Sequence, residues 1–166
     1  MKLKDNGLHF GIVTVFSHWL GAAILISFSV GVILTTATGS DAIRAFTLTI
    51  GLFSSGVHVC RMYWRLRNYH PAPLGGANPA QVLVGRGVAF GMLLAGIILP
   101  VMFKIKEGNW QQEFLNSQEW WFVPLFWVGF TCFLLGLLLH LYGAFTHVFT
   151  LKDDSLKRIL GLPVDL

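Results

Sequence analysis

The sequence predicts an all-α protein, a four-helix transmembrane bundle that runs up-down-up-down as one domain (residues 1–166). Only 12% of its residues are charged and 54% are hydrophobic, whereas a soluble domain carries about 25% charged residues. The mean hydropathy is +0.64. Four apolar runs, at 10–36, 45–64, 82–103 and 121–151, each reach the length of about 20 residues that one membrane crossing needs. Composition and patterning therefore agree on a membrane bundle.

The first run (10–36) is longer than the apolar part of a signal peptide and lacks a small-residue cleavage site after it. We therefore expect a helix that is retained rather than cleaved. The T-G-S-D segment at 38–41 predicts a tight turn into the second helix. Ser40 or Asp41 is the expected N-cap, because short polar side chains accept hydrogen bonds from the first turn of a helix.

The composition of the other two connections also predicts their structure. Residues 70–79 are rich in Pro and Gly, which predicts a loop between the second and third helices. Between the third and fourth helices, residues 107–121 predict a short amphipathic helix at the membrane interface, with Trp120 and Trp121 in the aromatic belt. The fourth run exceeds the length of an untilted crossing, so part of it is expected to project into an interface.

Basic residues predict the orientation. Nine of the twelve lie on one side of the predicted bundle, at the two termini and around the central connection, and only Arg44, Lys104 and Lys106 lie on the other. The positive-inside rule therefore places both termini in the cytoplasm. The net charge of +4 is explained by this topology and by lipid headgroups, so it gives no reason to expect nucleic-acid binding.

The two cysteines, Cys60 and Cys132, are isolated in the second and fourth helices. No C-x-x-C-H motif is present, which excludes covalent attachment of c-type haem, and no zinc spacing exists. We expect both to be buried free thiols, because free cysteine behaves as a small apolar residue.

Four of the six histidines fall in or near the predicted membrane helices, while His9 and His70 are expected at the surface. Ionisable side chains inside a membrane usually face the bundle interior and have a function. His18 and His140 lie at a similar depth, about 12–15 Å from the cytoplasmic boundary on antiparallel helices. Two histidines placed in this way predict axial ligation of one haem b.

The other candidates are open to more than one role. His147 shares a helix face with His140, about 10 Å nearer the surface; it could ligate iron, contact a haem propionate, bind a quinone headgroup or extend to the interface. His58 and Arg61 suit a propionate or quinone site, or a plain interface position. Gly21, Gly136 and Gly143 flank the histidines and either admit the flat porphyrin or serve helix packing.

In several motifs the chain resembles the bacterial cytochrome b561 family, from about residue 14 to residue 160. The matching pieces are S-H-W at 17–19, R-x-x-x-R-L at 61–66, P-A-P at 71–73, L-P at 99–100, and the segment from L-H at 139–140 through L-K-D-D-S-L-K-R-I-L at 151–160. The resemblance implies a four-helix protein of the bacterial inner membrane that binds b-type haem and transfers electrons.

Family members typically hold two haems, and the resemblance implies that His18 and His140 bind the cytoplasmic one. At the two positions that bind the outer haem in the family this chain has Thr47 and Phe126, and the helix-three histidines are replaced at about Arg86 and Ala89. We therefore expect one haem b; two would require other ligands. Loss of the outer pair also argues against superoxide oxidation at the outer face, an activity of some family members.

The leading functional hypothesis is a membrane electron carrier of the oxidoreductase type, which exchanges electrons with quinone or a redox protein and has no separate catalytic residue. A second hypothesis is the haem-bearing membrane anchor of a larger dehydrogenase or hydrogenase. A third, from a different class, is a degenerate family member that acts as a structural or interaction subunit without turnover. The sequence is compatible with an oligomer or a larger complex.

Overall fold

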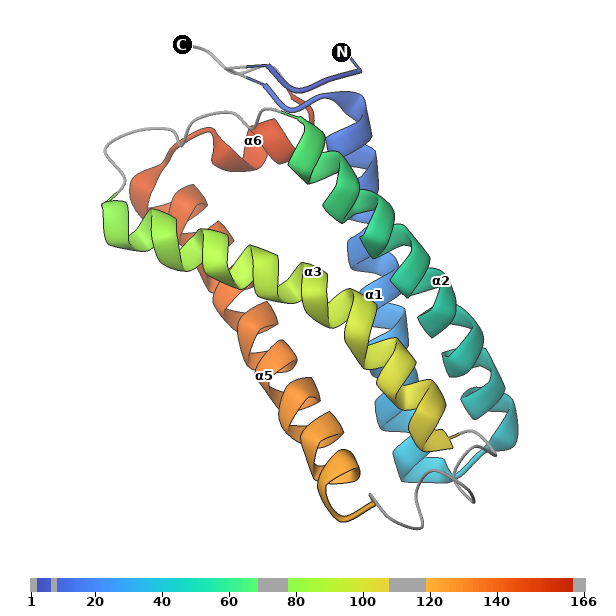
Figure 1. The fold of residues 1–166 in the computed structure, drawn as a ribbon. Helices are drawn as coiled ribbons and strands as arrows, with labels where there is room; N and C mark the ends of the chain where they lie inside the picture. Colours follow the sequence, from blue (N-terminus) through green and yellow to red (C-terminus); the bar gives the residue numbers. More distant parts are fainter. Residues whose placement is uncertain (1–2, 7–8, 69–77, 108–118, 163–166) are drawn as a thin grey trace.

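The computed structural model describes residues 3–6, 9–68, 78–107 and 119–162. Four long helices dominate it, each long and apolar enough to cross a membrane: α1 (Ile12–Thr38), α2 (Asp41–Arg67), α3 (Pro79–Glu107) and α5 (Glu119–Thr146). They alternate in direction along the chain (Figure 1). No strand occurs among the described residues. The predicted all-α bundle of four membrane-spanning helices is therefore confirmed.

Two short elements follow α5. The π-helix η1 (His147–Leu151) continues it, and α6 (Ser155–Ile159) turns across one end of the bundle. This end also holds the start of α1, the end of α2 and the start of α3 (Figure 1), and we call it the α6 end. Because the chain crosses the bundle an even number of times, α1 begins and α5 ends on the same side.

The turn between α1 and α2 forms as its residues predict. Gly39 takes a left-handed conformation (φ 64°) and its N–H donates to the Thr35 carbonyl, which ends α1. Ser40 is confirmed as the N-cap of α2, where its hydroxyl accepts from the Ile43 N–H at 3.5 Å. The predicted Pro/Gly-rich loop at 70–79 and the amphipathic helix within 107–121 lie mostly outside the described residues.

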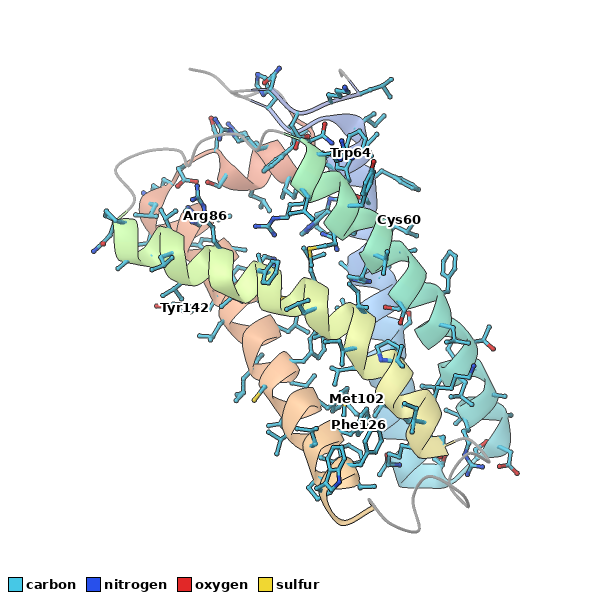
Figure 2. The ribbon with its side chains drawn as sticks, in the orientation of Figure 1. Cys60, Trp64, Arg86, Met102, Phe126 and Tyr142 are labelled. Atoms are coloured by element: carbon cyan, nitrogen blue, oxygen red, sulfur yellow. The ribbon has the colours of Figure 1, made fainter. Side chains whose placement is uncertain are left out.

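The hydrophobic core lies in the half of the bundle away from the α6 end. It combines side chains of α1, α3 and α5: Leu25, Phe28, Val32, Leu99, Phe103, Phe126, Phe130 and Phe133. The Phe126 ring centroid lies 5.9 Å from that of Phe103 and 6.0 Å from that of Phe130, distances at which aromatic pairs attract. Figure 2 shows Phe126 in this half of the bundle. This half is closed by direct side-chain packing.

The half near the α6 end is packed differently. Among the described residues, α3 buries none before Leu93 and α5 buries none after Phe133. In Figure 1, α3 and α5 separate from α1 and α2 toward this end, and α6 lies across it. Protein side chains alone therefore do not build a core between the helices in this half.

The expectation that both cysteines are buried is wrong. Cys60 and Cys132 are free but exposed on the helix surfaces, which face lipid in a membrane bundle. Lipid tails accommodate a small apolar side chain as well as a protein core does, so an apolar cysteine does not reveal which side of a membrane helix it occupies.

Candidate functional site

His18 of α1 and His140 of α5 face each other across the α6 half of the bundle. Their ring centroids are 6.2 Å apart and the ring planes are inclined by 50°. Both side chains are half-buried. The structure thus brings together two histidines that are distant in sequence and that lie on different helices.

Their separation can be compared with the size of a metal centre. An imidazole nitrogen lies about 2 Å from a bound metal and about 1.1 Å from its ring centre. Two imidazoles on opposite sides of one ion therefore have ring centroids about 6 Å apart. The observed 6.2 Å matches this separation. No group of three or more metal-binding side chains occurs among the described residues, so an ion here would take its protein ligands from this pair.

The glycines beside the histidines have two different environments. A Cβ added at Gly136 or Gly143 of α5 would meet no neighbouring atom within 4 Å, whereas one added at Gly21 of α1 would lie 2.6 Å from the Arg61 guanidinium. Gly136 and Gly143 lie on the same face of α5 as His140. They leave room beside His140, whereas the Arg61 side chain occupies the space beside Gly21.

Arg61 connects α2 to this pair. Its guanidinium Nη2 lies 3.5 Å from Nδ1 of His18. One turn further along α2, the Trp64 indole N–H donates to the Thr14 hydroxyl at 3.0 Å, which fixes the end of α2 against α1. The Trp19 indole N–H donates to the Ile159 carbonyl at 3.0 Å and so attaches α6 to α1. Arg61 thus lies beside the His18–His140 pair.

His58 is buried between α2 and α3. It is 1% exposed, its Nδ1 lies 2.8 Å from the Ser54 carbonyl oxygen, and its ring packs on Gly96 of α3. The Ser54 hydroxyl donates to the Gly96 carbonyl at 3.4 Å. Ser54 and Gly96 belong to no recognisable motif, so the sequence did not predict them as partners of His58. The described contacts of His58 join α2 to α3.

His147, the first residue of η1, is also separate from the His18–His140 pair. Its Nδ1 lies 2.6 Å from a carboxylate oxygen of Asp153, and the Ser155 N–H donates to the other oxygen at 2.9 Å. Burial raises the pKa of the Asp153 carboxyl, but the hydrogen bonds from Ser155 and His147 outweigh it and hold that pKa below its ordinary value. Asp153 and Ser155 were not predicted as partners of His147, although the D-D-S sequence is typical of a helix N-terminus.

The positions that hold a second ligand pair in the resemblance are filled with core residues. Thr47 is 0% exposed; its hydroxyl donates to the Ile43 carbonyl at 2.7 Å and lies 3.3 Å from the Thr35 hydroxyl. Phe126 is 0% exposed within the aromatic core. Neither side chain is an iron ligand of the usual kind, and together they leave no room for a porphyrin between these helices. The described residues therefore fit a haem in the α6 half and not in the opposite half.

Known proteins resemble this chain over nearly its whole length. Residues 9–162 match the prokaryotic cytochrome b561 family. The chain is similar to cytochrome b561 homolog 2 of Escherichia coli (strain K12), with 27% identity over 185 aligned positions that cover 97% of this chain and 96% of that protein. No solved structure gives a significant match. This chain therefore belongs to the prokaryotic cytochrome b561 family, a family of multi-pass membrane proteins of the bacterial inner membrane that bind b-type haem and transfer electrons.

Proposed function

We propose that the chain binds one haem b between α1 and α5, with His18 and His140 as its axial ligands, and exchanges electrons with quinone or a redox protein. The observation that carries this proposal is the 6.2 Å separation of the two ring centroids, because it suits two imidazoles on opposite sides of one iron. When bound, the haem iron supplies a one-electron couple.

The protein residues supply position and environment. His18 and His140 provide imidazole nitrogens from opposite sides, and the open faces of Gly136 and Gly143 accommodate a flat ring beside His140. Arg61 places a positive charge next to His18. The aromatic core occupies the other half of the bundle, which limits the proposal to one haem per chain.

The proposed quinone contact lies near His147. This histidine is on the same face of the chain as His140 but closer to the α6 end, and Asp153 fixes its ring. An imidazole whose Nδ1 is held by a carboxylate presents its other ring nitrogen as a hydrogen-bond partner for a quinone carbonyl or a quinol hydroxyl. His147 is therefore placed to bind a quinone headgroup without ligating the iron.

The proposal includes an orientation with both termini in the cytoplasm, which rests on the distribution of basic residues. A fusion of alkaline phosphatase to the C-terminus is expected to be inactive, and a fusion of a cytoplasmic fluorescent reporter is expected to be active. The reverse result would place the α6 end in the periplasm.

The test of the haem site is the haem content of the purified full chain. A pyridine haemochromogen assay is expected to give one haem b per polypeptide. His18→Ala and His140→Ala are each expected to lose most of the low-spin haem, because either change removes one of two axial ligands. Two haems per polypeptide, or full haem content in His140→Ala, would contradict the proposal.

A further inference from the structure

Three arginines, from α2 and α3, lie near one another in the α6 half of the bundle. Arg61 and Arg65 lie one turn apart on the same face of α2, and Arg86 lies near the start of α3 (Figure 2). Arg65 is close enough to both Arg61 and Arg86 to feel a repulsive charge interaction with each. The positive charge of Arg61 also reaches both His18 and His140.

No ion pair between this cluster and a carboxylate occurs among the described contacts. The acidic groups in the described ion pairs have other basic partners: Asp41 and Glu107 pair with Arg44 at the opposite end of the bundle, Asp153 with His147, and Asp154 with Lys157. Like charges that gather in a partly buried place repel one another strongly, because the surroundings screen them poorly. Their arrangement is therefore suited to an anion that the protein does not itself provide.

The side chains of the cluster indicate the chemistry of that anion. Arginine presents a planar fork of donors that matches a carboxylate or a phosphate in two parallel hydrogen bonds. Arg61 and Arg65 are half-buried, whereas Arg67, two residues further along α2, is exposed and lies over the Tyr63 ring at 5.4 Å. Arg61 and Arg65 consequently lie partly inside the bundle, on the side of α2 where Arg61 contacts His18. Arg86 is exposed and approaches Arg65 from the start of α3.

We propose that Arg65 and Arg86, together with Arg61, form a carboxylate-binding cluster that holds the two propionates of the haem. This inference rests on the proposed haem site and adds its orientation: the propionate edge faces the α6 end. Arg65 lies about 6 Å nearer that end than Arg61, so Arg61 is closest to the ligand histidines and the other two arginines are closer to the propionates.

The cluster has a second consequence. Ferric haem carries one more positive charge than ferrous haem, so neighbouring guanidinium groups destabilise the oxidised form more than the reduced form. They therefore raise the midpoint potential of the haem. If an arginine of the cluster served only to pack the helices, removing its charge would not make the midpoint potential of the haem more negative.

The first experiment compares two ligands on the native protein. The full chain, produced in haem-deficient membranes, is titrated with haemin and with haemin dimethyl ester, whose propionates carry no charge. The native protein is expected to bind the ester about tenfold more weakly than haemin, a difference of about 1.4 kcal/mol. Equal affinities for the two would overturn the cluster's assignment but leave the haem site intact; binding of neither would overturn the proposed function itself.

The second experiment changes the cluster. Arg65→Gln, Arg86→Gln and the double variant are expected to lose most of the preference for haemin over its ester, and to shift the midpoint potential to more negative values. Arg67→Gln is the matched control, since it removes the same charge from the same helix outside the cluster, and is expected to behave as the native protein. Arg65→Lys with Arg86→Lys keeps the charge and loses the planar fork, and provides a second test if the Gln variants do not fold.

A lipid phosphate is the alternative anion. Titrations in vesicles of phosphatidylglycerol and of phosphatidylcholine distinguish the two sources. If the haem propionates occupy the cluster, the haemin preference is expected to be similar in both lipids. Two results would overturn the propionate assignment. One is a preference for haemin over its ester that disappears in phosphatidylcholine vesicles. The other is a set of Gln variants that keep this preference and lose only the effect of phosphatidylglycerol on haemin binding.

Discussion

The imidazole ring of His58 on α2 packs directly against Gly96 on α3. A Cβ added to Gly96 would lie 2.6 Å from the His58 ring, well inside normal contact distance, and His58 is held in place by the Ser54 carbonyl. Neither the ring nor the helix backbone can move far, because both are buried. The contact between α2 and α3 therefore depends on the absence of a side chain at position 96.

Gly96→Ala is expected to destabilise the bundle by about 1–3 kcal/mol, the usual cost of forcing an extra group into a packed core. Thermal unfolding of the purified protein in detergent, followed by circular dichroism, measures this change. Gly56→Ala is the control, because a Cβ at Gly56 of the same helix pair meets no atom within 4 Å. If Gly96→Ala lowers the unfolding temperature no more than Gly56→Ala does, the contact between His58 and Gly96 does not constrain the helices.

Haem binding is expected to require a small residue at position 143 of α5. A Cβ there meets no protein atom within 4 Å, so Gly143→Ala should be tolerated by the fold and gain about 0.5–1 kcal/mol from improved helix propensity. Gly143→Phe should fold but place an aromatic ring beside His140 and sharply lower the haem content.

The measurement is haem per polypeptide at matched helical content. Tyr142→Phe provides a control on the same turn of α5, because Tyr142 is 71% exposed and its side chain is on the outer surface. Full haem content in Gly143→Phe would mean that the porphyrin does not lie against this face of α5.

Restoring histidines in the opposite half is not expected to restore a second haem. Thr47→His combined with Phe126→His supplies two imidazoles, but the surrounding phenylalanines still fill the space between the helices. Two buried imidazoles without partners also cost stability, of the order of 1–3 kcal/mol each. The double variant should keep one haem per chain and unfold at a lower temperature; a second haem would show that ligand identity alone controls occupancy there.

Asp153 is expected to stabilise the junction between η1 and α6 in its ionised form. Its pKa in the folded protein lies below the ordinary value of 3.8, so its contribution is present above that pH and is lost as the pH falls through the lowered folded-state pKa. Asp153→Asn should therefore cost about 1 kcal/mol near pH 7 and cost less at about pH 3, where part of this contribution is lost.

Thermal unfolding of the native protein and the variant at both pH values tests this expectation. Asp154→Asn is the control, since Asp154 pairs with Lys157 at the surface, where such pairs contribute less than about 1 kcal/mol. An equal effect of Asp153→Asn at both pH values would show that its charge is not what holds His147.

The number and course of the membrane helices are predictable from the amino-acid sequence alone. Apolar runs of sufficient length must form helices in lipid, because only a helix satisfies all its backbone hydrogen bonds within one segment. An N-cap at Ser40 or Asp41 follows from local chemistry, and the similar depth of His18 and His140 follows from a rise of about 1.5 Å per residue. The structure selects Ser40. These features depend on residues that are close in sequence or on distance along one axis.

The faces at which the helices meet are not predictable in this way and are seen in the folded bundle. In a membrane, lipid and core are equally apolar, so hydropathy does not distinguish a buried side chain from an exposed one; this is why the prediction for Cys60 and Cys132 was wrong. The same limit hid the packing of His58 on Gly96 and the gathering of arginines from α2 and α3. Those relationships depend on the rotation of each helix about its axis, which is set by the shapes of side chains from all four helices together.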